Sequence, residues 1–201
     1  MTPSDAELLD EWAAGDARAG SRLFRRYFAP LSRYFFNKVP GEHDDLIQET
    51  FMACLHGRHR LRDKSSFRSF LFGVAGNVLR MHFRRLRLHQ PPETLEDCSA
   101  HDLQPGPSTF LALQDEERVL LDALRCIPVP LQIVMELYYW EEMRTHEIAE
   151  AVGLPLGTVR SHLRRGRQLL EQELGRHRLA PGVSLEQRAS TLRSTVARSC
   201  A

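Results

Sequence analysis

The sequence predicts an all-α protein made of two small helical domains joined by a flexible linker. Apolar residues recur three, four and seven positions apart through most of the chain, which is the period of amphipathic helices. Proline and glycine divide these stretches into lengths of roughly 10–20 residues, as in ordinary globular helices. The segment QPPETLEDCSAHDLQPGPST has four prolines and few apolar residues, which is typical of a linker. We therefore expect a first domain at 1–89, a linker at 90–109, a second domain at 110–175 and a C-terminal extension at 176–201.

The first domain is expected to begin with two helices. Ser4 and Glu7 have the spacing of a capping box, which starts a helix that Gly15 ends. A longer helix is expected at 17–38, because large apolar side chains recur on one of its faces: Phe24, Phe28, Leu31 and Phe35. Aromatic residues at this spacing indicate core packing rather than a ligand site.

Two further helices are expected after the Pro40-Gly41 break. The helix at 42–56 turns Ile47, Phe51 and Cys54 inward and leaves an acidic outer face: Asp44, Asp45, Gln48 and Glu49. A basic loop then leads to a helix at 67–87, whose last turns are rich in arginine. Cations near a helix C-terminus are favoured by the helix dipole, and they can also contact phosphate.

The second domain is expected to end in a helix-turn-helix at 145–170. Gly153, Leu154 and Pro155 end its first helix, since glycine tolerates a left-handed cap and proline cannot continue a helix. The second helix turns one stripe inward: Val159, Leu163, Gly166 and Leu170. Its outer face is basic and carries Arg160, Ser161, Arg164, Arg165 and Arg167. This second helix has the size and charge to enter the major groove of DNA. The helices before it are expected to break at Pro128 and Pro130.

Composition narrows the function classes. The net charge of only +1 indicates a chain that contacts DNA on some faces and a protein partner on others. No apolar run approaches the ~20 residues of a membrane span, and no signal peptide is recognisable, so we expect a cytoplasmic protein. The four cysteines form no CxxC pair, so we expect no disulfide framework and no structural zinc site. We also expect no other metal site and no cofactor.

Two parts of the chain resemble one protein family. DDLIQETF at 44–51 and SFRSFLFGVAGNVLRMHFRR at 66–85 resemble region 2 of bacterial sigma factors, and LPLGTVRSHLRRGR at 154–167 resembles region 4. Their order and separation are similar to those of the extracytoplasmic-function (ECF) group, which keeps only these two regions. The resemblance implies a protein without enzymatic activity that binds core RNA polymerase and directs promoter recognition, DNA melting and transcription initiation. It also implies promoter DNA and an anti-sigma factor as partners.

The resemblance implies three binding surfaces. The acidic helix face matches the family's DLxQE motif, which docks on the largest polymerase subunit; the implied residues are Asp44, Asp45, Leu46, Gln48, Glu49 and Phe51. The surface for the minus-ten element includes the asparagine of the IAxN motif, which helps to hold an unstacked base; the implied residues are Leu61, Arg62, Asp63, Asn77, Arg80, Arg84 and Arg85. The surface for the minus-thirty-five element is the recognition helix, with Thr158, Arg160, Ser161, His162, Arg164, Arg165 and Arg167.

Three positions depart from the family pattern. Gly76 and His162 stand where arginine is common, and Phe70 replaces the usual tryptophan. Gly76 removes a DNA contact and costs about 1 kcal/mol of helix stability. His162 makes one cationic contact weaker or dependent on pH. These departures point to atypical melting or sequence preference.

Two other function classes fit parts of the sequence. A stand-alone helix-turn-helix regulator shares the GTVRSHL-like helix, but such regulators normally carry a dimerisation or receiver domain. An enzyme could use the neighbouring carboxylates of Asp44, Asp45 and Glu49, but no phosphate loop, GxSxG elbow or HExxH accompanies them. The C-terminal extension can be interpreted as a frayed tail or as a regulatory helix. The second interpretation depends on apolar residues that recur at helical spacing: Leu185, Ala189, Leu192 and Val196.

Overall fold

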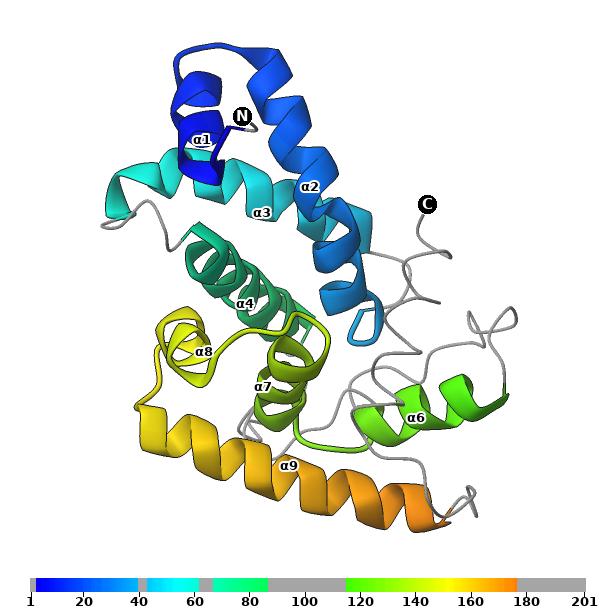
Figure 1. The fold of residues 1–201 in the computed structure, drawn as a ribbon. Coiled ribbons are helices and arrows are strands. Elements are labelled where there is room, and N and C mark those ends of the chain that lie inside the picture. Colours follow the sequence, from blue (N-terminus) through cyan, green and yellow to red (C-terminus); the bar gives the residue numbers. More distant parts are fainter. Residues whose placement is uncertain (1–2, 40–42, 62–66, 87–114, 177–201) are drawn as a thin grey trace.

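The computed structural model describes residues 3–39, 43–61, 67–86 and 115–176, and the elements in these ranges are helices (Figure 1). In chain order they are α1 (Asp5–Ala13), α2 (Ala17–Phe36), α3 (His43–Gly57), the 3-10 helix η1 (Arg58–Arg60), α4 (Phe67–Leu86), α6 (Asp115–Arg125), α7 (Val129–Tyr139), α8 (Thr145–Val152) and α9 (Leu156–Arg176). The all-helical class is confirmed. The predicted linker and nearly all of the predicted extension lie outside the described residues.

The first helical group consists of α1 to α4, and it begins with the predicted capping box. The Ser4 hydroxyl accepts a hydrogen bond from the Glu7 backbone N–H at 3.3 Å, and Glu7 Oε2 accepts one from the Ser4 N–H at 2.7 Å. Both bonds satisfy backbone donors that have no partner within the helix. After α1 the chain turns at Gly15, whose φ of +105° lies in the region that favours glycine.

The buried stripe of α2 is rotated from the predicted one. Leu31 and Phe35 are buried as predicted, but Phe24 is 36% exposed, so its prediction as a core residue is wrong. Leu23 and Tyr27 are buried instead, and the Tyr27 ring lies 5.5 Å from the Phe67 ring of α4. Both rows have helical spacing, so the aromatic pattern could not decide between them.

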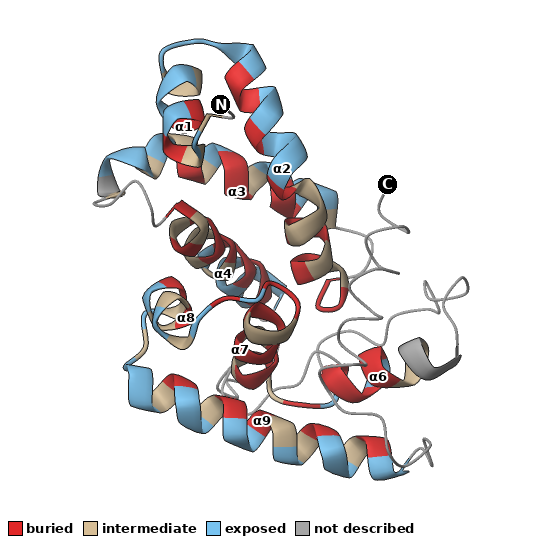
Figure 2. Ribbon diagram, in the orientation of Figure 1, coloured by how far each residue is buried: buried red, intermediate tan, exposed pale blue. Residues whose placement is uncertain are grey.

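The second helical group consists of α6 to α9 and contains the predicted helix-turn-helix. Gly153 follows α8 with a φ of +70°, the left-handed cap expected between the two helices. The predicted stripe of α9 is buried, and Figure 2 shows buried and exposed residues alternating along this helix. Pro130 does not break the chain as expected. It lies in the first turn of α7, where a missing N–H has no cost.

The two helical groups pack directly against each other, which the sequence did not predict. Helix α4 lies between them, with α3 on one side and α8 on the other (Figure 1). Gly73 of α4 makes this approach close, because a Cβ atom there would lie 2.9 Å from the backbone carbonyl oxygen of Ala151 in α8. We call this packing of α4 on α8 the docked arrangement.

Membrane and metal signals can also be checked over the described ranges. Among these residues, no helix combines the length and the apolar character that crossing a membrane requires. Within the same ranges, no group of three or more His, Cys, Asp or Glu residues could hold a metal ion.

Candidate protein and nucleic-acid interfaces

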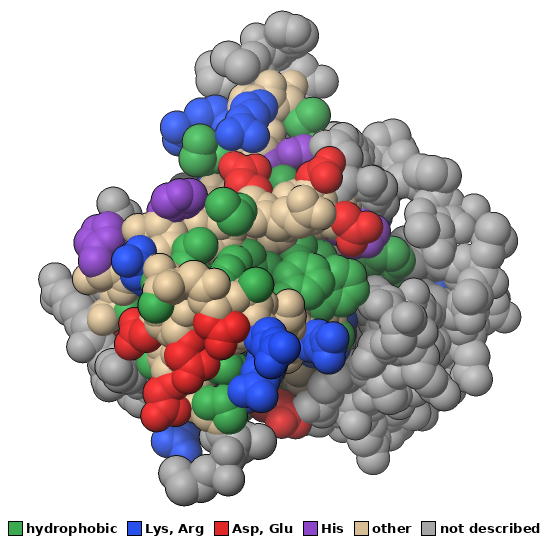
Figure 3. Space-filling model, turned by 90° about the horizontal axis from the view of Figure 1, so that it is seen from above, with side chains coloured by type: hydrophobic (Ala, Val, Ile, Leu, Met, Phe, Trp, Pro, Cys, Tyr) green, Lys and Arg blue, Asp and Glu red, His purple; other side chains and the backbone are tan. Residues whose placement is uncertain are grey.

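The outer face of α3 is acidic, as the sequence predicted. Asp44, Asp45 and Gln48 are exposed, while Glu49 is half-exposed and lies 3.6 Å from the guanidinium of Arg85. The two aspartates also lie in the first turn of α3, where the helix dipole favours negative charge. Figure 3 shows acidic and basic side chains in separate groups on the face of the molecule that carries α1 to α3.

Two members of the implied polymerase-binding set do not reach this surface. Leu46 and Phe51 are buried among the first helical group, with 4% and 3% of their surfaces exposed. Phe51 packs against the ring of Phe24 at 5.0 Å. Both side chains therefore hold α3 in place, and the candidate surface reduces to the four polar residues.

The second candidate surface lies on the C-terminal half of α4. Asn77, Arg80, Arg84 and Arg85 are all exposed, and the Arg80 guanidinium donates a hydrogen bond to Asn77 Oδ1. The amide and the cation are thus presented together, one helical turn apart. Leu61 is half-buried after η1, whereas Arg62 and Asp63 lie outside the described residues.

Two of the three positions that depart from the family pattern, Gly76 and Phe70, lie on α4. A Cβ atom at Gly76 would lie 3.5 Å from the Tyr34 hydroxyl, which is an ordinary contact. Glycine at this position is therefore not required by packing. Phe70 is half-buried with its ring 6.5 Å from that of Phe67, so an aromatic side chain does fill this position.

The third candidate surface is the recognition helix α9. Arg160, Ser161, Arg164 and Arg165 are exposed, whereas Thr158 and His162 are half-buried. Arg167 was expected to contact DNA, but its side chain is half-buried. Its guanidinium lies 5.7 Å and 5.4 Å from the ring centroids of Tyr138 and Tyr139 at the end of α7. A cation over two aromatic faces is partly held by the protein, so Arg167 fixes α9 on α7 in addition to any phosphate contact. The consecutive tyrosines were the sequence signal for this contact.

A buried ion pair joins the two helical groups, and sequence reasoning missed it. The Lys38 ammonium donates to Glu136 Oε2, and the two side chains are 0% and 2% exposed. Lys38 also donates to the Tyr34 carbonyl at 2.5 Å, and Gln132 donates to Glu136 Oε1 at 2.9 Å. Burial lowers the pKa of Lys38 and raises the pKa of Glu136, and the ion pair opposes both shifts. Each charge is therefore tolerated in the interior because the other is present.

A second set of ion pairs lies beside the first. Glu141, whose side chain is 5% exposed, accepts from Arg33 of α2 at 2.9 Å and lies 3.1 Å from the Arg68 guanidinium of α4. One carboxylate that follows α7 thus holds two helices of the first group. Charge-assisted hydrogen bonds of this kind fix the register of a contact.

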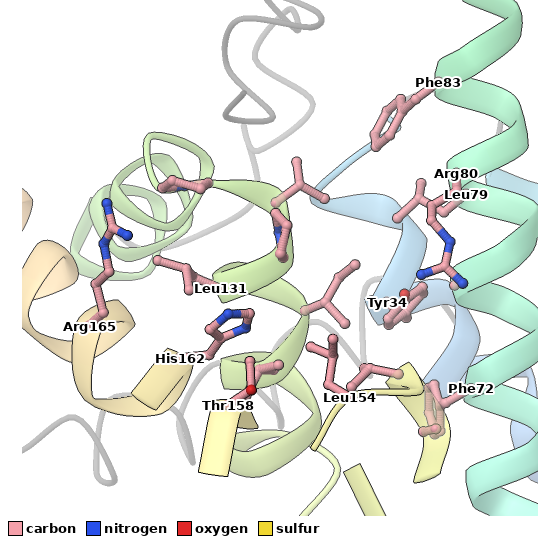
Figure 4. Close-up of a pocket in the computed structure, with 18 residues that line it drawn as sticks. Tyr34, Phe72, Leu79, Arg80, Phe83, Leu131, Leu154, Thr158, His162 and Arg165 are labelled. Atoms are coloured by element: carbon pink, nitrogen blue, oxygen red, sulfur yellow. The ribbon is translucent and has the colours of Figure 1, made fainter. Parts of the chain in front are cut away.

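A cavity of about 520 Å³ lies between the two groups (Figure 4). Its walls are mostly apolar and come from α2, α4, α7 and the helix-turn-helix. Arg80 of the second candidate surface lines it, as do three residues of the third: Thr158, His162 and Arg165. The docked arrangement therefore brings parts of both candidate DNA surfaces to one cavity.

Both halves of the chain match known protein families. Residues 22–88 match the family described as Sigma-70 region 2, and residues 117–170 match the family described as Sigma-70, region 4. RNA polymerase sigma factor HrpL of Pseudomonas syringae pv. syringae is 33% identical over 135 residues, which cover 65% of this chain and 72% of that protein. The ECF RNA polymerase sigma-E factor of Haemophilus influenzae is 26% identical over 184 residues, which cover 85% of this chain and 95% of that protein.

A solved structure supports the fold. The structure of CnrH in complex with the cytosolic domain of CnrY is similar, with a TM-score of 0.60 and 22% identity, over 86% of this chain and 98% of that chain. At this identity the likeness concerns the arrangement of helices.

Proposed function

Because this chain belongs to the ECF group of RNA polymerase sigma factors, we propose that it binds core RNA polymerase and directs promoter recognition, DNA melting and transcription initiation. The observation that carries this proposal is the pair of family matches, at 22–88 and 117–170, in the order that the ECF group requires. A stand-alone helix-turn-helix regulator does not account for the match to region 2. The chain acts by binding, and we assign it no catalytic residue and no cofactor.

The acidic face of α3 is proposed as the polymerase-binding surface. Its exposed members are Asp44, Asp45 and Gln48, with Glu49 at its edge. Carboxylates and an amide on one rigid helix pair well with arginines on a basic partner, and they fix the register of the complex. Leu46 and Phe51 support this face from the core.

The exposed part of α4 is proposed as the minus-ten surface. Asn77 offers an amide that can hydrogen-bond the edge of an unstacked base, and Arg80 is already bonded to it. Arg84 and Arg85 follow on the same helix, where they can contact phosphates of the melted strand. Leu61, Arg62 and Asp63 remain expected members of this surface.

The exposed face of α9 is proposed as the minus-thirty-five surface. Arg160, Ser161, Arg164 and Arg165 are placed for base edges and backbone in the major groove. Thr158, His162 and Arg167 flank them, and Arg167 is the member most restrained by the protein itself. A bidentate arginine–guanine contact here would contribute about 1–3 kcal/mol of discrimination.

We also propose an anti-sigma protein as a partner and the cytoplasm as the site of action, where polymerase and promoters are found. CnrH, whose fold is similar, was solved in complex with the cytosolic domain of CnrY. The same acidic and basic surfaces that serve polymerase and DNA are available for such a regulator to cover.

Two of the three surfaces, the α3 face and the α9 face, can be tested by one variant each with a shared control. Asp45→Lys should reduce co-elution with bacterial core polymerase, because it reverses one charge on the α3 face. Arg165→Ala should leave co-elution unchanged and reduce promoter-specific transcription. Glu11→Lys, an exposed charge reversal on α1, serves as the control. If Asp45→Lys binds core as well as the control does, the assignment of the α3 face is wrong.

A further inference from the structure

The cavity between the two helical groups has the size and the lining of a site for a small molecule. Its volume of about 520 Å³ falls within the range of ligand pockets, roughly 300–1,000 Å³. Aromatic and aliphatic side chains form most of its wall, and they include Phe72 and Phe83 of α4 and Ile133 of α7. Such a wall favours a ligand with an apolar body, because burial of apolar surface is the main favourable term in binding.

One polar group in this wall, the Tyr34 hydroxyl of α2, is buried. The residue is 2% exposed, and its hydroxyl makes no hydrogen bond within the described part of the chain. Burial raises the pKa of this phenol above its usual value, so the hydroxyl keeps its proton at neutral pH and can donate. A buried donor without an acceptor is costly, and an oxygen atom of a ligand in the cavity would satisfy it.

A cation lies beside this hydroxyl. Arg80 of α4 also lines the cavity, and its guanidinium lies beside Tyr34 in Figure 4. One of its nitrogens donates to Asn77 Oδ1, and no carboxylate of the described residues pairs with it. A guanidinium carries five N–H donors, so further donors remain for an anion. The negative charge nearest to this end of the cavity, Glu136, is already paired with Lys38.

Gly76 of α4 leaves the space in front of the Tyr34 hydroxyl open. A Cβ atom there would lie 3.5 Å from the hydroxyl oxygen, and Gly76 itself lines the cavity. A longer side chain would extend into the space that a ligand needs to reach the hydroxyl. The arginine that is common at this position in the family would fill that space, so this departure from the family pattern gives a ligand access.

We propose that this cavity binds an amphipathic monocarboxylate, a fatty or aromatic acid whose carboxylate contacts Arg80 and the Tyr34 hydroxyl. Its apolar body packs along the wall that α4 and α7 form. A carboxylate suits the polar end because it accepts hydrogen bonds from a guanidinium and from a neutral hydroxyl at the same time. Arg80 also belongs to the proposed minus-ten surface, so a bound acid competes with promoter DNA for it. This last consequence alone rests on the proposed function.

The test is isothermal titration calorimetry of the full-length chain with decanoate, naphthoate and decanol. Decanoate and decanol have apolar chains of nearly the same length, but only decanoate carries a charge. Arg80→Gln removes the cation, Tyr34→Phe removes only the hydroxyl, and Gly76→Leu fills the space in front of it. The matched control is Arg25→Gln, which removes an exposed cation of α2 that does not line the cavity. Circular dichroism checks that each variant is folded.

The expected result is that at least one of the two acids binds, and that decanol binds about tenfold more weakly or worse, because hydrogen bonds to a charged group are the strong ones. Arg80→Gln and Tyr34→Phe should each weaken binding of that acid about tenfold or more. Gly76→Leu should abolish binding, and Arg25→Gln should bind as the wild type does.

Four results would overturn the inference. They are no binding of either acid, equal affinity for decanol, equal weakening in Arg25→Gln, and unchanged affinity in any of the three cavity variants. The titration uses neither polymerase nor DNA, so its failure leaves the proposed function standing. A chain that binds the acid but never binds core polymerase would refute the proposed function alone.

Discussion

Replacing Lys38 by methionine should open the contact between the two helical groups. The substitution keeps an unbranched apolar stem but leaves Glu136, which is 2% exposed, without its cation. Removing one partner of a buried ion pair costs about 3–5 kcal/mol. Lys38 and Glu136 belong to different helical groups, so separation of the groups relieves this cost by returning Glu136 to water. The loss of docking is therefore expected before either group unfolds.

The effect of Lys38→Met on docking should depend on pH, and the direction of this dependence follows from the titration of Glu136. Burial already raises the pKa of Glu136 in the wild type, and Lys38 is the main influence that opposes this shift. Without Lys38, the docked state favours the protonated carboxyl still more. A group whose pKa is higher in the docked state than in the undocked state stabilises the docked state at pH values below its undocked pKa. This stabilisation is lost as the pH rises through the pKa that the group has in the docked state. The variant should therefore be open at pH 8 and close as the pH falls toward 5.

Small-angle scattering between pH 8 and pH 5 measures this change directly. The double variant Lys38→Met/Glu136→Gln carries no titrating group at this position, so its radius of gyration should not follow the same pH dependence. A variant Lys38→Met that stays compact at pH 8 would refute the reasoning. An identical pH response in the double variant would do so as well, because it would assign the titration to another group.

Three further predictions concern single sites. Arg165→Ala should lower transcription from a cognate promoter roughly 5- to 150-fold, equivalent to about 1–3 kcal/mol, while core binding persists; unchanged transcription would contradict the recognition face. Gly20→Ala should lower the free energy of unfolding in urea by about 1–3 kcal/mol, because its Cβ would lie 2.6 Å from the Trp12 indole; an unchanged midpoint would contradict this contact. Burial raises the pKa of the Cys54 thiol to about 12, so iodoacetamide at pH 8 should label exposed Cys126 at least ~100-fold faster by peptide mass spectrometry, and equal rates would show that Cys54 is accessible.

The sequence predicted best where one local rule decided the structure. The Ser4–Glu7 capping box and the Gly153 cap depend on residues three or four positions apart, and both are present. The buried stripe of α9 was also predicted, since its residues recur at helical spacing within a largely polar and basic segment. The acidic face of α3 was predicted from the same helical period, because turning its apolar residues inward leaves the carboxylates on the outer face.

Prediction failed where two rows of residues on one helix both had helical spacing. It also failed where two residues in contact lie far apart in the chain. In α2 the rows beginning at Leu23 and Phe24 both have helical spacing and both lead to Leu31 and Phe35. The buried row is the first, and its Tyr27 packs against Phe67 of α4. The buried ion pair between the helical groups joins Lys38 and Glu136, 98 positions apart, and no periodicity relates them. A lysine within FFNKV and a glutamate within IVMELYY were the available signals, since both are charges in apolar surroundings.

The most direct test of the central claim mixes the purified chain with sigma-free bacterial core polymerase and a library of random promoter sequences, then sequences the transcripts that initiate. A sigma factor of this group should co-elute with core and select promoters that share two separated elements, and Arg165→Ala should change the preference at the upstream element. Tight DNA binding with no association with core would contradict the account and would mean that the helix-turn-helix serves a stand-alone regulator.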